Sequence, residues 1–223
     1  MITEESMTLL YKAIEVYNRL ADKDYLLACN ISKNQPIEYL ILRINRHNFW
    51  HLLGCKTIKT DTSNSPADID LYAECLRKHN IAEYLVYTHT AQDLKAKYNV
   101  FMNIFDFIAN AKAVRICKTD STPEYYQFKI AVGQHTGIIG YDYENQSLSI
   151  LFPKTAQNKS IGNFDNDRSA KRILYILSKP ITNSSFDRIE YAPSESVFKK
   201  IILELPDAYD STIRTQYKEE NNI

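Results

Sequence analysis

Glycine is scarce in this sequence, which holds five glycines among 223 residues. None belongs to a G-x-G-x-x-G or G-x-x-x-x-G-K pattern, so the sequence argues against a glycine-rich loop for nucleotide phosphates. No run approaches the roughly eighteen apolar residues that cross a bilayer, and the first residues lack the features of a signal peptide. The four cysteines are scattered without C-x-x-C or metal-finger spacing. We therefore expect a cytoplasmic protein with reduced thiols and no membrane contact.

A surplus of either charge is also missing, because 27 lysines and arginines balance 27 aspartates and glutamates. This balance argues against a nonspecific nucleic-acid coat, which normally needs a basic surplus. The charge is nevertheless uneven along the chain. Residues 31–59 carry five basic and one acidic side chain, residues 153–182 carry six and two, and residues 203–223 carry two and five. A local basic face is therefore compatible with the neutral total.

Helices are predicted mainly in the first half of the chain. Three segments have apolar residues at steps of three and four, the spacing of one buried helical face, and each follows a residue that can cap a helix. These segments are residues 3–21, 65–79 and 90–108. Arg46–Gly54 is predicted to form a short helix that Gly54 ends, and Ser194–Leu205 a terminal helix.

From residue 113 the apolar period changes to two, which predicts strands. They are expected near residues 113–117, 126–132, 137–143, 147–152, 173–177 and 186–191. Their short connections are typical of an antiparallel meander, and the polar stretch Lys154–Asp167 is predicted to be a loop. One earlier segment, Ile37–Ile44, is dense in aliphatic residues and predicts a strand buried on both faces.

Helices first and a clustered antiparallel sheet second is an α+β arrangement. The chain contains no internal repeat and no low-complexity linker, so we predict a single domain over residues 1–223. Within it we expect a helical extension over residues 1–30, a core over residues 36–191, and a C-terminal helix with an acidic tail over residues 194–223.

The block Arg46–Gly54 is the first candidate site. His47 and His51 lie four residues apart and would share one face of a helix, which is compatible with a zinc pair. The glutamate of H-E-x-x-H is missing between them, so metal binding is disfavoured. His51 alone could act as a general acid and base, since histidine titrates near neutral pH. A hydrogen-bonded structural histidine is the alternative reading.

A second candidate cluster runs from Tyr141 to Lys159 and includes Ser149, Lys154 and Thr155. A lysine can stabilise the charge of a phosphorane-like transition state, and a hydroxyl can orient a phosphate oxygen. The alternative is an ordinary solvated loop that happens to carry a lysine and a threonine.

Together these residues resemble a family. The strand Tyr39–Ile44 followed by Asn48–Gly54 is similar to a phage-associated nuclease-like family, in which an aromatic–x–His-Leu–x–Gly signature follows the first strand. The family is named for barnase, EndoU, colicin-type and RelE-type ribonucleases, and the sequence looks closest to its fourth subfamily. Residues 112–118, 139–141 and 152–155 resemble its later blocks. The resemblance covers roughly residues 36–159 and would reach residue 191 at most.

The resemblance implies helices before a curved antiparallel sheet, and cleavage of RNA without a metal or other cofactor. In this reaction a base takes the proton of the ribose 2′-OH, cations stabilise the phosphate, and an acid protonates the leaving 5′-oxygen. It implies His51 as the acid–base group, Lys154 and Arg46 as phosphate clamps and Thr155 as a supporting hydroxyl. The further residues expected to contact the substrate are Arg115, Tyr141 and Ser149.

Three functions stay open on the sequence. The first is a toxin-like, RNA-cleaving hydrolase of a phage or mobile element, a context in which an antitoxin or immunity protein is an expected partner. The second is a non-catalytic module that binds RNA or protein. The third is a zinc-dependent hydrolase that uses His47 and His51. The first requires that His51 meet Lys154 or an arginine within one cleft.

Overall fold

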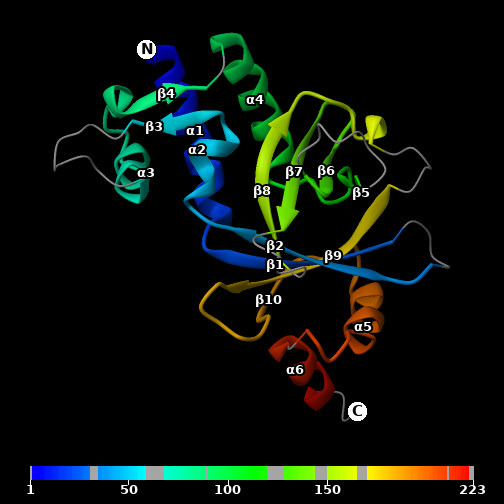
Figure 1. The fold of residues 1–223 in the computed structure, drawn as a ribbon. Coiled ribbons are helices and arrows are strands. Elements are labelled where there is room, and N and C mark those ends of the chain that lie inside the picture. Colours follow the sequence, from blue (N-terminus) through cyan, green and yellow to red (C-terminus); the bar gives the residue numbers. More distant parts are fainter. Residues whose placement is uncertain are drawn as a thin grey trace.

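The structure, a computed structural model, describes residues 2–30, 35–58, 68–88, 90–119, 128–143, 150–164, 170–209 and 211–220. The fold is α+β, as the sequence predicts, and is built on one large sheet and a smaller one (Figure 1). The helices of the first half lie at one end of the large sheet, and the C-terminal helices lie at the other end.

The large sheet closes on itself like a barrel. Its strands are hydrogen-bonded in the order β1 (Lys23–Asn30), β2 (Glu38–Ile44), β8 (Ile150–Gln157), β7 (Gly137–Tyr143), β6 (Ile130–Gln134), β5 (Arg115–Lys118), β9 (Lys171–Pro180) and β10 (Arg188–Tyr191). Because β9 also pairs with β1, seven of the eight strands form the closed part and β10 extends one edge.

The prediction of a curved antiparallel sheet is therefore correct for most pairings and wrong in two respects. The sheet is closed, and β2 runs parallel to β8 through the pairs Ile41–Ile150 and Leu42–Leu151. A period of two tells which residues share a face, but it does not tell which strands become neighbours after a long connection. Neither the closure nor the parallel contact could be read from the alternation.

The N-terminal helix α1 (Glu4–Leu20) begins as predicted, with the Thr3 hydroxyl accepting a hydrogen bond from the backbone N–H of Ser6. The predicted helical extension over residues 1–30 is helical only over Glu4–Leu20, because β1 occupies residues 23–30. Residues 25–29 are all buried, so this strand lacks the alternation that would have revealed it.

The other elements of the first half pack around α1 and contact the large sheet mainly through α2 and α4. They are the helices α2 (Asn48–Leu52), α3 (Asp68–Leu76) and α4 (Ala91–Ile104), the 3₁₀ turn η1 (Ala82–Tyr84), and a two-stranded sheet of β3 (Cys55–Thr57) and β4 (Leu85–Tyr87). Thr90 and Asp93 form the predicted capping box of α4. The predicted cap of α3 at Ser65 lies outside the described residues.

An aromatic cluster joins α1 to α2, α3 and α4. Tyr17 of α1 packs on Phe49 of α2 at 5.3 Å between ring centroids, on Phe101 of α4 at 6.3 Å, and on Phe105 at 4.9 Å. Tyr72 of α3 completes the cluster at 5.6 Å from Phe49. Large aromatic surfaces in mutual contact contribute strongly to a core of this size. The position of α2 is thereby fixed from its buried side.

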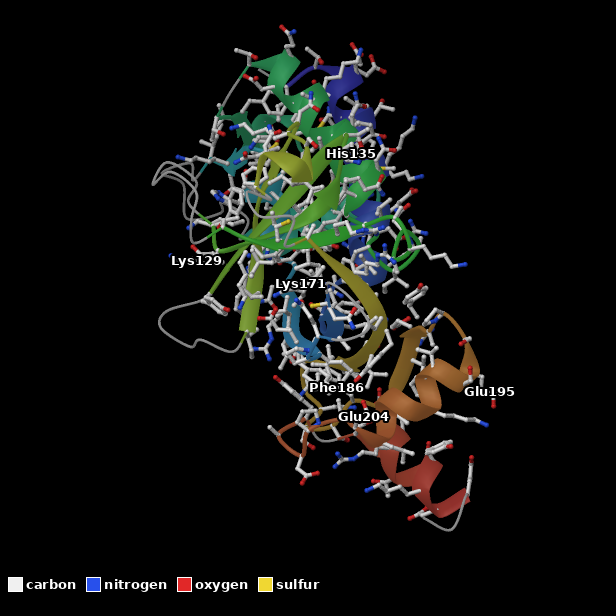
Figure 2. The ribbon with its side chains drawn as sticks, turned by 90° about the vertical axis from the view of Figure 1, so that its right-hand side faces the viewer. Lys129, His135, Lys171, Phe186, Glu195 and Glu204 are labelled. Atoms are coloured by element: carbon white, nitrogen blue, oxygen red, sulfur yellow. The ribbon has the colours of Figure 1, made fainter. Side chains whose placement is uncertain are left out.

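The C-terminal helices α5 (Glu195–Leu203) and α6 (Thr212–Glu220) cover a second apolar cluster at the far end of the sheet. Phe186 lies where these helices meet the strands (Figure 2) and packs with Phe198 and Ile202. Tyr39 and Ile41 of β2 are partly buried against the same cluster, whereas Leu40 and Leu42 face the main core. The strand predicted to be buried on both faces is therefore fully buried on one and half-buried on the other. None of the helices in the described ranges is long and apolar enough to cross a membrane.

Candidate functional site

The block Phe49–Gly54 is built almost wholly for packing. Phe49, Trp50, Leu52 and Leu53 are at most 3% exposed, while His51 between them is exposed. The burial of its neighbours on both sides therefore forces the imidazole of His51 outward. The sequence prediction of a short helix here is confirmed.

Gly54 ends this helix in a conformation that favours glycine, with φ of 74°. Its carbonyl oxygen accepts hydrogen bonds from the backbone N–H and the hydroxyl of Thr88, each at 2.9 Å. Thr88 directly follows β4, so these bonds tie the end of α2 to the two-stranded sheet. They also bring Lys56 of β3 close to His51.

The other side of α2 is tied to strand β8. The side-chain amide of Asn48 donates a hydrogen bond to the carbonyl oxygen of Pro153 at 3.2 Å. Asn48 lies one helical turn before His51, so this bond holds the histidine beside the strand that carries Lys154 and Thr155.

Strand β8 contains a bulge at this point. Gly140 of β7 pairs with Thr155 but Tyr141 pairs with Pro153, so Lys154 is an extra residue in its strand. Leu151 and Ala156 both belong to the main core although they are an odd number of positions apart, which a regular strand would not allow. The bulge therefore places Lys154 and Thr155 together on the outer face. Beyond the bulge, β8 continues through Gln157, so the predicted loop Lys154–Asp167 is wrong over its first four residues.

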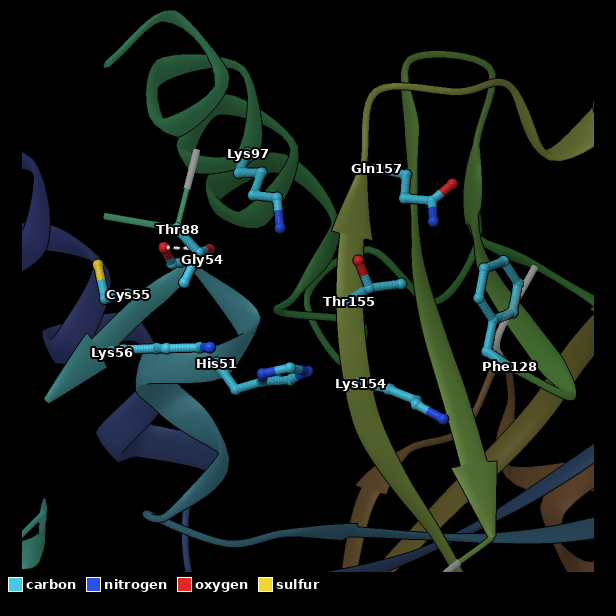
Figure 3. Close-up of a pocket in the computed structure, with 10 residues that line it drawn as sticks. All are labelled: His51, Gly54, Cys55, Lys56, Thr88, Lys97, Phe128, Lys154, Thr155 and Gln157. Atoms are coloured by element: carbon cyan, nitrogen blue, oxygen red, sulfur yellow. Dashed lines mark hydrogen bonds between the residues drawn. The ribbon is translucent and has the colours of Figure 1, made fainter. Parts of the chain in front are cut away.

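These elements enclose a pocket of about 270 Å³ between α2, β3, α4 and β8 (Figure 3). It is lined by His51, Gly54, Cys55, Lys56, Thr88, Lys97, Phe128, Lys154, Thr155 and Gln157. Three of these residues are lysines, and they come from three different elements. None of the described residues that line the pocket is an aspartate or a glutamate, so the site is suited to an anion.

The three lysines differ in their surroundings. The Lys154 ammonium forms an ion pair with Asp142 at 2.8 Å, outside this pocket. Lys56 is exposed at the rim. Lys97 is partly buried, and burial lowers the pKa of its ammonium below the ordinary value.

The pKa of His51 is lowered by all three lysines. Partial burial of its ring is the largest cause that lowers its pKa, followed by the positive charges of Lys97, Lys154 and Lys56. A pKa below the ordinary value of 6.5 leaves the imidazole neutral at pH 7. The ring can then accept a proton, which is the state that a general base requires.

A second pocket of about 260 Å³ adjoins the first and shares His51 and Lys154 with it. Asn48, Asp142, Tyr143, Phe152 and Pro153 complete its lining. His51 and Lys154 therefore lie on the ridge between two hollows, so that an extended ligand could occupy both sides of the histidine.

Three of the predicted site residues, His51, Lys154 and Thr155, meet in the first pocket. Two others lie elsewhere. Arg46 forms an ion pair with Asp22 at 2.8 Å and lies over the ring of Tyr72. Arg115 donates hydrogen bonds to the carbonyl oxygens of Lys112 and Val114 at the start of β5.

Tyr141 is 0% exposed inside the barrel, where burial raises the pKa of its hydroxyl. It offers no surface to a substrate, because its position on β7 faces the core. Ser149 lies outside the described residues. His47 does not line the first pocket, and the described residues hold no group of three histidine, cysteine, aspartate or glutamate side chains that could bind a metal ion. The zinc hypothesis therefore lacks a third ligand in the described part of the chain.

The sequence reasoning missed Lys56, Lys97, Gln157 and the positioning residue Asn48. In the sequence, Lys97 follows Asp93 by one helical turn, a spacing that is typical of solvent-exposed residues on a helix. Lys56 could have been noticed, since it lies two residues after the glycine that ends the histidine block. The roles of Lys97, Gln157 and Asn48 depend on which elements meet in space, so the sequence alone does not show them.

The fold and the pocket together define a class: an α+β domain with a barrel-like sheet and, between that sheet and the neighbouring elements, a pocket lined by one histidine and three lysines. The chain matches the model of the family described as phage-Barnase-EndoU-ColicinE5/D-RelE like nuclease4 over residues 9–192. It belongs to this nuclease-like family, which confirms the resemblance and the fourth subfamily predicted from the sequence. No curated protein and no solved structure matches the chain. The matched region includes β1 and leaves α5 and α6 outside.

Proposed function

We propose that this chain is a metal-independent endoribonuclease whose active site is the pocket around His51. The single observation that supports the proposal most strongly is that His51 shares one pocket with Lys56, Lys97 and Lys154, and that none of the described residues lining this pocket is a carboxylate; the carboxylate of Asp142, which pairs with Lys154, lies outside it. Cleavage of a phosphodiester by a neighbouring 2′-OH uses this combination. A base removes the proton of the hydroxyl while cations stabilise the negative charge that develops on the phosphate oxygens.

In the proposed reaction, the neutral ring of His51 takes the proton of a ribose 2′-OH. The 2′-oxygen attacks the adjacent phosphorus, and the bond to the 5′-oxygen breaks. Lys154 and Lys56 stabilise the additional negative charge on the phosphoryl oxygens, and the Thr155 hydroxyl orients one of them. Arg46 and Arg115 have no role in the proposal, since neither lines the pocket.

The test is incubation of the purified protein with mixed RNA in EDTA, followed by analysis of the product ends. We expect 2′,3′-cyclic phosphate and 5′-hydroxyl ends, and loss of cleavage in His51→Ala. His47→Ala is the matched control, because His47 is exposed and does not line the pocket. Cleavage that persists in His51→Ala would refute the assigned site.

Two further outcomes would redirect the proposal. An RNA strand with a single 2′-deoxyribose should resist cleavage at that nucleotide, and cleavage there would exclude attack by the 2′-oxygen. Binding of RNA without cleavage by the wild-type protein would support a non-catalytic module instead. A protein that inhibits this nuclease would have to cover a cationic pocket, so we expect acidic residues on an antitoxin or immunity partner.

A further inference from the structure

Lys97 is the pocket lysine whose position suits proton transfer best. Figure 3 shows Lys97 pointing from α4 and His51 pointing from α2 toward the same space, with Thr155 on the facing strand β8. The two titratable side chains therefore approach the pocket from separate elements. Cleavage by in-line displacement needs a base at the attacking oxygen and an acid at the leaving oxygen, on opposite sides of the phosphorus.

The backbone of Lys97 is held firmly. The capping box of Thr90 and Asp93 fixes the first turn of α4. One turn after Lys97, the side chain of Val100 fills the space beside Gly137, where an added Cβ would lie 2.7 Å from it. Phe101 is 0% exposed in the aromatic cluster. The helix can neither rotate nor shift without disturbing these contacts, so the side chain of Lys97 starts from a fixed point at the edge of the pocket.

Lys97 also lacks the carboxylate partner that the Lys154 ammonium has. It forms no ion pair with any residue in the part of the chain that the structure describes. Asp93, one turn earlier on the same helix face, uses its Oδ2 atom to accept hydrogen bonds from the N–H and the hydroxyl of Thr90, at 3.1 and 2.7 Å. The Lys97 ammonium is therefore available to a ligand.

The charged and titratable groups around Lys97 come from every described element that forms the pocket. They are His51 on α2, Cys55 and Lys56 on β3, Lys154 on β8 and Asp93 on α4 itself. Burial lowers the pKa of Lys97, while Cys55 and Asp93 act in the opposite direction. An ammonium that is easier to deprotonate is a better proton donor at neutral pH.

We infer that Lys97 is the catalytic acid that protonates the leaving 5′-oxygen, as the counterpart of His51. This inference rests on the proposed function. As the P–O5′ bond breaks, its electron pair goes to O5′, and the Lys97 ammonium transfers one proton to that oxygen. The products are a 2′,3′-cyclic phosphate and a free 5′-hydroxyl. His51 holds the proton of the 2′-OH, and its release to water while Lys97 takes one up returns both groups to their starting states.

The test compares two substrates that differ in the leaving group. The first is uridylyl-(3′,5′)-adenosine, whose 5′-alkoxide must be protonated. The second is uridine 3′-(4-nitrophenyl phosphate), whose nitrophenolate leaves without a proton. Lys97→Arg keeps the positive charge but cannot release a proton near neutral pH. Lys95→Arg is the matched control, because Lys95 is an exposed residue of the same helix.

For Lys97→Arg we expect kcat on the dinucleotide to fall by about 10²- to 10⁴-fold, the usual contribution of a general acid. Its kcat on the nitrophenyl ester should stay near that of the wild type, and Lys95→Arg should match the wild type on both. In the wild type, the rate on the dinucleotide should fall as pH rises through the pKa of Lys97. The nitrophenyl ester should lack this basic limb.

Equal losses on both substrates would overturn the inference, because Lys97 would then act through its charge or through folding. Full activity of Lys97→Arg on the dinucleotide would overturn it as well. Thermal unfolding of the variants separates a folding defect from a chemical one, and Lys97→Met gives the effect of losing both charge and proton. Failure of the wild type to cleave either substrate would instead refute the proposed function.

Discussion

Replacement of Gly140 by alanine would test how tightly the pocket is coupled to the barrel. Gly140 lies on β7 opposite Thr155, and Phe128 covers it from the outer side. An added Cβ would lie 2.6 Å from two atoms of the Phe128 ring and 3.0 Å from the Thr155 methyl group. Carbon atoms in contact normally lie about 3.5–4.0 Å apart. The neighbours would therefore have to move by about 1 Å to make room.

Neither neighbour can move freely. Phe128 is 3% exposed and packs on Phe164 at 5.6 Å between ring centroids. Thr155 belongs to β8, which is hydrogen-bonded to β7. Overpacking of this kind costs about 1–3 kcal/mol of the free energy of unfolding. For a chain of this size, each kcal/mol lowers the melting temperature by about 2–4 °C.

Urea denaturation and thermal melting would measure this loss, and RNA cleavage would measure its effect on the pocket. Because Phe128 and Thr155 both line the pocket, cleavage by Gly140→Ala should fall further than the unfolded fraction explains. Gly162→Ala is the control, since an added Cβ there meets only the Ser160 hydroxyl at 3.5 Å, an ordinary contact. If Gly140→Ala were as stable as Gly162→Ala, the packing argument would be refuted.

Four further outcomes follow from the geometry around α2. Asn48→Ala removes the hydrogen bond to Pro153 and should lower the free energy of unfolding by about 0.5–1.5 kcal/mol in urea, with a larger loss of cleavage; an unchanged midpoint would contradict this. Neutral His51 is the active form, so cleavage should decline as pH falls through its pKa, below 6.5. Lys56→Met removes a charge that lowers this pKa, so the acidic limb should shift toward higher pH, and a shift the other way would count against the site. Gly54→Ala forces an alanine to adopt a φ of 74° and should lower the free energy of unfolding, measured by thermal unfolding, by about 1–2 kcal/mol. Gly54→Asn should lower it less, because asparagine adopts this conformation more readily, and equal stability of the two variants would argue against backbone strain at this position.

Much of the local structure could be predicted from the sequence because local chemistry determines it. The helix starts at Thr3 and Thr90 use side-chain caps that a reader can recognise, and both are present. The end of α2 at Gly54 follows from the conformational freedom of glycine. The candidate residues His51, Lys154 and Thr155 line one pocket, as the nuclease hypothesis requires, although Lys154 and Thr155 lie on strand β8 and not on the predicted loop.

The features that could not be predicted depend on contacts between distant segments. Strand β1 is buried on all sides between β2 and β9, so its sequence shows no alternation. The bulge at Lys154 reverses the faces of the following residues, which a continuous alternation cannot reveal. Lys97 belongs to the pocket only because α4 packs beside β7 and β8, so its sequence neighbours give no sign of its role.

Within Phe49–Gly54, one residue is available for chemistry and the other five hold the helix in place. Five of these six residues are buried or conformationally constrained, and each would be needed to hold α2 in place even in a protein that cleaved nothing. Only His51 reaches the surface, where it gains little from packing. A match to this block therefore indicates the fold and one reactive group, but cleavage of a phosphodiester also requires cations and a proton donor. Those come from β3, α4 and β8, outside the block, so substitutions of Lys56, Lys97 and Lys154 separate a nuclease from a binding module more sharply than the block itself can.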